Sequence, residues 1–248
     1  MLPNYPRKNI TWSPSSIEAH FQLDSGRYCK LSIEQYSEHR LVFASENLVC
    51  MMKNKSTLVF QKNEPDGLRE TIASFPEFEL IPPYQAFPMS NGNTISFVRN
   101  IKSSEKAVII IDEDGMVISS SKAGESPWHS QNSICESNGI IMFAEYPINA
   151  RDNHPILDAG IFRSIDYGLS WERVFEIPYP QIRHWHTLKS DPFVPGSWIA
   201  TSGDEPEQCK WFLTRDDGET WEEITDTGFI CSKVPSRSLS AHRTTTFQ

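Results

Sequence analysis

The chain has 248 residues and a formal net charge of −9, with Asp and Glu outnumbering Lys and Arg by 32 to 23. This acidity excludes a nucleic-acid-binding groove, because contacts to phosphates require a basic surface. No apolar run approaches the ~18–20 residues that span a membrane. The N-terminal segment 1–12 lacks the apolar core of a signal peptide, so the sequence predicts a cytoplasmic protein without a membrane span.

The composition favours β-strands over helices. Phe, Trp and Tyr number 14, 7 and 7, and no long stretch rich in Ala, Leu, Glu and Lys carries a helical period. The five cysteines are scattered without a C-x-x-C pair, which excludes a zinc ribbon and predicts reduced thiols. A chain of this length can bury a substantial core without metal or disulfide staples.

Turn signals recur along the chain at nearly constant intervals. Five glycines each follow an apolar run and an aspartate one or two positions earlier, and the intervals between them are 41, 48, 53 and 50 residues. A period of ~40–50 residues is that of a four-stranded propeller blade. The turn glycines are Gly26, Gly67, Gly115, Gly168 and Gly218.

Short apolar runs fill the intervals between these turns. They are β-branched or aromatic and are bounded by Gly, Pro, Asn or Ser, as strands are. The runs are 41–44, 48–52, 57–60, 107–111, 140–143, 160–162, 197–200 and 210–213. No segment longer than ~10 residues has the pattern of an amphipathic helix.

Two of the turns share a longer motif, (S/T)-x-D-x-G-x-(S/T)-W. It occupies 164–171 and 214–221, exactly one interval of 50 residues apart. Glycine supplies a positive φ in a tight hairpin, and the aspartate and hydroxyl side chains can accept turn N–H groups. The tryptophan can then pack as a large apolar plug at the start of the outgoing strand.

The sequence therefore predicts one all-β domain over residues 1–248, a β-propeller of four-stranded antiparallel blades with about five blade repeats. The segment 240–248 resembles the start of another inner strand. Either it completes the first blade of a five-bladed ring, or the chain is a fragment of a six- or seven-bladed propeller. The repeats are centred near 24–29, 64–70, 111–118, 164–171 and 214–221.

The two full motifs and their flanks resemble the Asp-box, or bacterial neuraminidase (BNR), repeats of sialidase-like and glycosyl-hydrolase-like propellers. The resemblance is specific over residues ~160–225 and only positional over ~20–120. In that family the box joins the outer two strands of a blade, away from the ligand face. The resemblance thus implies structural roles for Asp166, Gly168, Trp171, Asp216, Gly218 and Trp221.

The chain departs from true sialidases in the residues that carry their activity. It has no Arg-Ile-Pro segment, and the contexts of Arg99, Arg151 and Arg183 do not support a substrate-gripping arginine triad. True sialidase activity is therefore not expected.

Candidate inner strands begin near Trp128, His184 and Ser240, at equal intervals of 56 residues. In a propeller the innermost strands line a central channel, and loops at one face form a funnel. Polar residues near the ends of these strands are therefore candidate ligand contacts.

Five residues fall at such places: Glu145 and Tyr146 after the second strand of the fourth repeat, Asp204 at the matching place in the fifth, and His184 with His186. We expect them around the mouth of the channel, on the face opposite the box turns. Each also has a structural interpretation: the histidines as buried, hydrogen-bonded imidazoles, Glu145 and Tyr146 as rim and packing residues, and Asp204 as a turn cap.

Two classes of function fit these residues. In the first, the protein is a glycoside hydrolase or polysaccharide lyase acting on acidic or decorated glycans, with Glu145 and Asp204 as the two carboxylates of hydrolysis or Tyr146 and a histidine moving the proton of a lyase reaction. The alternative is a non-catalytic propeller that binds a glycan or protein. No cofactor is expected, except that His184 and His186, on one face of a strand, could hold a divalent metal.

Overall fold

The structure is a computed structural model. It describes residues 10–13, 16–22, 28–34, 39–45, 47–65, 67–128, 131–148 and 156–225. Before residue 39 it gives only the course of the backbone.

The described strands form five antiparallel sheets. The first contains β1 (Ile10–Ser13), β2 (Ser16–Gln22) and β3 (Tyr28–Glu34), and the second contains β4 (Arg40–Ala44), β5 (Leu48–Asn54), β6 (Thr57–Glu64) and β7 (Gly67–Ser74). The third contains β8 (Phe78–Leu80), β9 (Ala86–Pro88), β10 (Thr94–Asn100), β11 (Lys106–Ile111) and β12 (Val117–Ser121). The fourth contains β13 (Ile134–Ser137), β14 (Ile140–Ala144), β15 (Ala159–Ser164) and β16 (Glu172–Ile177), and the fifth contains β17 (Trp185–Ser190), β18 (Trp198–Ser202), β19 (Trp211–Thr214) and β20 (Glu222–Glu223).

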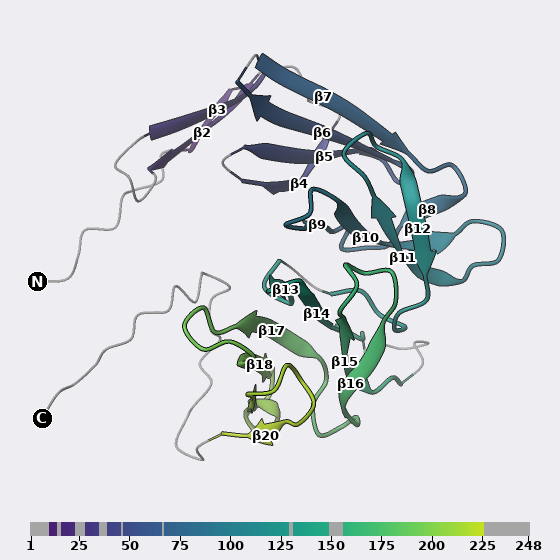
Figure 1. The fold of residues 1–248 in the computed structure, drawn as a ribbon, viewed down its shortest axis with the longest axis vertical. Helices are drawn as coiled ribbons and strands as arrows, with labels where there is room; N and C mark the ends of the chain where they lie inside the picture. The colour runs from purple at the N-terminus through teal and green to yellow at the C-terminus, as the bar shows by residue number, and fades with distance from the viewer. Residues whose placement is uncertain are drawn as a thin grey trace, which may run out of the picture.

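The sheets are the blades of a β-propeller, which confirms the predicted fold class. In the second, fourth and fifth sheets the strands pair in chain order, whereas β8 and β9 of the third both pair with β10. Figure 1 shows the sheets following one another around a central space, with β4, β9, β13 and β17 on the inner side and β7, β12, β16 and β20 on the outer side. We number the sheets blade 1 to blade 5 in chain order.

Helices are almost absent from the described part of the chain, as the composition predicts. The one helical segment there is a short 3₁₀ turn, Pro206–Gln208. Within the same residues no helix is long and apolar enough to cross a membrane.

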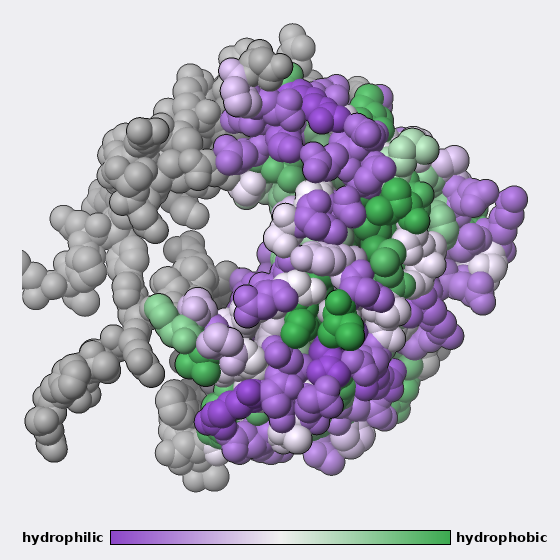
Figure 2. All heavy atoms as spheres, viewed as in Figure 1, coloured by the Kyte–Doolittle hydropathy of each residue, from purple (hydrophilic) through white to green (hydrophobic). Residues whose placement is uncertain are grey.

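The core lies between neighbouring blades, and β11 shows why its sequence is continuously apolar. Ile109 and Ile111 pack into the cluster shared with blade 2, while Val108 and Ile110 pack into the cluster shared with blade 4. Successive side chains of a strand point to opposite faces, so a strand with both faces covered has no polar positions. Burial of each such side chain stabilises the fold by about 1.5–3 kcal/mol. The surface in Figure 2 is mainly hydrophilic, with hydrophobic side chains gathered in a few small groups.

The predicted turns join the third and fourth strands of their blades. Gly67 opens β7, Gly115 lies between β11 and β12, and Gly168 and Gly218 lie between the last two strands of blades 4 and 5. Gly168 and Gly218 have φ values of 86° and 90°, in the left-handed region that favours glycine. The first predicted turn, at Gly26, lies outside the described residues.

The motif turn 164–171 is held by its own side chains. Ser164 Oγ donates to Asp166 Oδ1 at 2.7 Å and accepts the Gly168 N–H at 2.7 Å. Asp166 also accepts the N–H and the hydroxyl of Ser170, at 2.9 and 2.6 Å. The polar positions of the motif are therefore explained by local hydrogen bonds.

The motif turn 214–221 repeats this network with threonines in place of the serines. Thr214 Oγ1 donates to Asp216 at 2.7 Å and accepts the Gly218 N–H at 3.0 Å. Asp216 accepts the N–H and hydroxyl of Thr220 at 2.9 and 2.6 Å. The two turns thus occupy the same place in consecutive blades and have the same hydrogen bonds.

The predicted inner strands are placed unevenly. β17 begins at Trp185, next to the predicted His184, but β13 begins at Ile134 rather than near Trp128. Trp128 is fully buried and packs against Phe97 and Phe143, with ring centroids 6.1 and 5.6 Å away. Trp128 therefore packs into the core as part of the segment that precedes β13, which explains why the strand begins later than predicted. The predicted strand at 240–248 lies outside the described residues.

Candidate functional site

Strand direction brings all five predicted site residues to one end of blades 4 and 5. Tyr146 follows β14, and Asp204 follows β18. Because β17 and β18 are antiparallel and Trp185 pairs with Ser202, the start of β17 lies at the same end as Asp204. The motif turns lie at the opposite end, since each follows the third strand of its blade.

Trp185 fixes the two histidines on either side of it. Its side chain is fully buried, its indole N–H donates to the Ala159 carbonyl at 3.1 Å, and its backbone N–H donates to the Glu145 carbonyl at 3.2 Å. The pairing of β17 with β18 shifts register between Trp185 and Thr187. The rings of His184 and His186 lie with centroids 4.8 Å apart and planes at 83°.

Asp204 joins both histidines and a neighbouring arginine. Its carboxylate lies 3.2 Å from His184 Nε2 and 3.3 Å from His186 Nε2, and Arg183 donates to it at 3.0 Å. His186 Nε2 also contacts the Gly203 carbonyl oxygen. We call the set of Tyr146, Arg183, His184, His186 and Asp204 the His–Asp cluster.

Tyr146 covers the inner histidine. Its ring stacks on His184 with a centroid distance of 3.7 Å and an interplanar angle of 21°. It lies edge-on to His186 at 6.0 Å, and its backbone N–H donates to the Pro127 carbonyl at 3.1 Å. The tyrosine therefore restricts the orientation of the His184 ring.

His184 is the buried member of the cluster, with 4% of its surface exposed. Burial, and then the neighbouring His186, lower its pKa to about 4, although Asp204 acts in the opposite direction. Because a buried imidazole is costly to charge, His184 is neutral at pH 7.

The outer members of the cluster are accessible to a ligand. The side chains of His186, Asp204 and Arg183 are 36%, 33% and 32% exposed. Polar groups that are partly exposed and partly held by neighbours are the usual contacts of a binding site. The ligand atoms of His184, His186 and Asp204 all lie within 4.8 Å of one another, so these three residues could hold a metal ion.

Glu145 is the predicted site residue whose carboxylate the structure holds elsewhere. Only 2% of Glu145 is exposed, and its carboxylate accepts backbone N–H groups of Glu125, Ser126 and Gly160 at 2.6, 2.9 and 3.2 Å. Burial raises the pKa of Glu145, while these hydrogen bonds and Arg173 act against that rise. The carboxylate ties the segment before β13 to the start of β15.

Sequence reasoning missed Arg183 as a member of the cluster. It was considered only for an arginine triad with Arg99 and Arg151, yet Arg99 pairs with Glu79 of its own blade and Arg151 lies outside the described residues. The available signal was adjacency, since Arg183 directly precedes His184.

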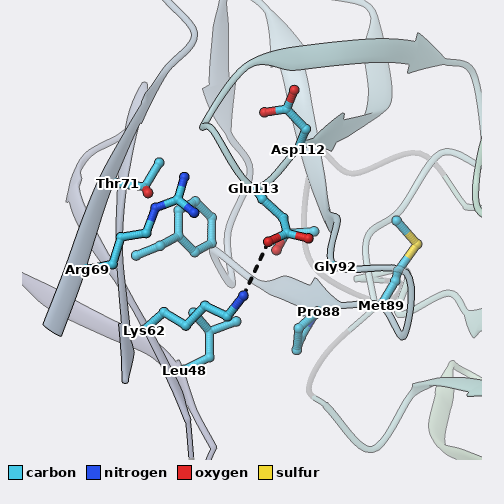
Figure 3. Close-up of a pocket in the computed structure, with 11 residues that line it drawn as sticks. Leu48, Lys62, Arg69, Thr71, Pro88, Met89, Gly92, Asp112 and Glu113 are labelled. Atoms are coloured by element: carbon cyan, nitrogen blue, oxygen red, sulfur yellow. Dashed lines mark hydrogen bonds and ion pairs between the residues drawn. The ribbon is translucent and has the colours of Figure 1, made fainter. Parts of the chain in front are cut away.

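A separate pocket lies between blades 2 and 3 (Figure 3). An ion pair crosses it, from Lys62 to Glu113 at 3.2 Å, and Arg69 at its edge pairs with Asp114 at 2.7 Å. These charges neutralise each other across the blade interface. The pocket is therefore better explained by packing of blades than by ligand binding.

No family model matches the chain, and no curated protein does. Among solved structures, it is similar to the GH74 xyloglucanase from Xanthomonas campestris, at 10% identity and a TM-score of 0.47 over 88% of this chain and 35% of that one. It is also similar to the N-terminal domain of Nup159, at 14% identity and a TM-score of 0.43 over 88% of this chain and 58% of that one. A third similar structure is a Synechocystis apocarotenoid oxygenase mutant, at 12% identity and a TM-score of 0.45 over 88% of this chain and 59% of that one. The chain thus spans about a third to three fifths of the length of these matched chains. Similarity at this level carries no inference about function.

Proposed function

We propose that the chain is an Asp-box propeller that binds acidic glycans at the His–Asp cluster. Two observations support the family. The motif turns have the same hydrogen bonds, and each joins the outer two strands of its blade, as the resemblance implies. The cluster lies at the end opposite these turns, where the resemblance places the ligand face.

The convergence of cationic and hydrogen-bonding groups from two blades is the observation that carries this proposal. Arg183, His186 and Asp204 are each about a third exposed, so a sugar can reach them. The whole chain carries a net charge of −9. An anionic ligand therefore depends on local donors, which Arg183 and the histidines supply.

The carboxylates of the site favour elimination over hydrolysis. Hydrolysis uses two carboxylates on either side of the glycosidic bond, but Glu145 is enclosed and bound to three backbone N–H groups. In an elimination from a uronate without a bound metal ion, His186 or Tyr146 would take the proton next to the sugar carboxylate, and the other would protonate the leaving oxygen.

Non-catalytic binding is the second candidate. It is favoured by the ion pair between Arg183 and Asp204, which occupies the one carboxylate of the cluster. A ligand carboxylate can compete for Arg183 without any reaction.

Calorimetry with polyuronates and their neutral counterparts tests both candidates, with ultraviolet absorbance reporting any unsaturated product. We expect acidic chains to bind, and His186→Ala and Arg183→Gln to weaken binding at least tenfold. Glu113→Gln, in the pocket between blades 2 and 3, is the control and should bind as the unmodified protein does. Binding without an unsaturated product supports the second candidate, and equal binding of neutral chains would overturn the proposal.

A further inference from the structure

His184 is a deeply buried imidazole that faces a carboxylate. It is 4% exposed, a hydrogen bond with the Pro147 backbone acts on its ring, and Nε2 lies 3.2 Å from Asp204 Oδ2. Most buried polar side-chain atoms in native proteins have partners, and a bound ion is one such partner. The side chain is aimed at Asp204, which His186 also approaches.

The separations within this trio match those of metal ligands. Ligands at the ~2.0–2.1 Å bonds of tetrahedral Zn²⁺ lie roughly 3.3–3.4 Å from one another. His184 Nε2 lies 3.2 Å from Asp204 Oδ2, and His186 Nε2 lies 3.3 Å from the other carboxylate oxygen, Oδ1. One ligand atom from each residue lies within 4.8 Å of the other two, so small side-chain rotations are enough to bring the three to metal-ligand separations.

We infer that His184, His186 and Asp204 bind a divalent first-row transition ion such as Zn²⁺, and that this ion coordinates the carboxylate of the acidic glycan. The second half of this inference rests on the proposed function. Two imidazoles and one carboxylate are a ligand set of zinc sites that keep a coordination position open. The exposed sides of His186 and Asp204 give a ligand access to that position.

The neighbouring residues hold the ligands in place before the ion binds. Trp185 anchors the backbone between the two histidines, and the Tyr146 ring lies flat against His184. Preorganised ligands of this kind lower the cost of forming a metal site. Binding exchanges the contact of His186 with the Gly203 carbonyl for a bond to the ion.

The charge of the site with the ion bound explains why it would attract an acidic ligand. Asp204 already balances Arg183, so a divalent ion leaves the cluster with a net positive charge. That charge repels further cations and attracts the carboxylate of a uronate. In a chain with a net charge of −9, the ion supplies the local field that the side chains alone provide only weakly.

Titration calorimetry of the metal-free protein with Zn²⁺ alone tests the site. We expect one equivalent to bind, and His184→Ala, His186→Ala and Asp204→Asn each to weaken binding at least tenfold. His39→Ala is the matched control, because His39 also directly precedes an inner strand, β4. Cys209→Ser controls for binding by the thiol nearest Gly203. Both controls should retain the affinity of the unmodified protein.

Absence of a one-equivalent site, or unchanged affinity in His186→Ala and Asp204→Asn, would overturn the inference. His186 and Asp204 are partly exposed, so their variants test it even if His184→Ala fails to fold, which a thermal melt reports. Polyuronate binding is then measured with and without a chelator. Glycan binding that survives the chelator contradicts the bridging role but leaves the proposed function intact. Zinc binding without glycan binding contradicts the proposed function and the bridging role but leaves the metal site intact.

Discussion

Glu145 and Asp204 follow the second strands of neighbouring blades, yet their carboxylates have different environments. Glu145 is buried against three backbone N–H groups, whereas Asp204 is a third exposed and contacts three cationic or ionisable side chains. A carboxylate at this position thus stabilises the fold in blade 4 and belongs to the candidate site in blade 5.

Glu145→Gln should destabilise the protein by about 1–3 kcal/mol, because the amide cannot satisfy all three N–H donors. The effect should depend on pH. The folded-state pKa of Glu145 is raised above its ordinary 4.5 by burial, so its contribution to stability is fully present below pH 4.5 and declines as the pH rises through the folded pKa. Urea unfolding at several pH values measures this difference. A destabilisation that grows with pH would contradict the assignment.

At the scale of elements, the motif turns are self-contained units. Thr220 and Thr214 lower the pKa of Asp216 to about 2 through hydrogen bonds to its carboxylate. Each turn ends in a half-buried tryptophan that packs into the core. Trp171 and Phe143 pack edge to face with ring centroids 5.1 Å apart, and Trp221 stacks on Phe175 with ring centroids 5.2 Å apart. The motif therefore couples a local turn to the packing between blades.

Trp171→Ala and Trp221→Ala should each cost about 2–3 kcal/mol of stability, less than the ~3–5 kcal/mol of a fully buried tryptophan, because both are partly exposed. Leu169→Ala is the control, since Leu169 lies in the first motif turn but is 55% exposed. Thermal melts should show clear losses for both tryptophan variants and almost none for the control. Equal melting temperatures for all three variants would refute the packing role.

At the scale of the whole molecule, these turns also connect consecutive blades. Ser121 of blade 3 donates to the Gly168 carbonyl at 3.3 Å. Arg163 of blade 4 donates to the Asp217 carbonyl at 2.7 Å and to Glu219 at 2.6 Å in the turn of blade 5. The turn of each of these blades is thus bound by the blade before it.

Arg163→Leu should lower the free energy of unfolding by about 1–3 kcal/mol, because the side chain is 11% exposed and binds across the interface of two blades. Arg215→Leu is the matched control. Arg215 is 63% exposed and pairs with Glu222 within its own blade, so its loss should cost at most about 1 kcal/mol. Chemical denaturation compares the two. A larger loss for Arg215→Leu would show that the interface bond contributes little.

The sequence by itself determined the blades, because their signals are local. A turn such as 164–171 closes its hydrogen bonds within eight residues, and the apolar runs predict β5, β6, β11 and β14 wherever the sheets lie. It also brought His184, His186, Tyr146 and Asp204 to one end of the blades through strand direction. Only the tertiary structure decided that the Glu145 carboxylate turns to backbone amides and that Arg183 pairs with Asp204. Those choices depend on the register of β17 against β18 and on segments far apart in the chain, which no local pattern encodes.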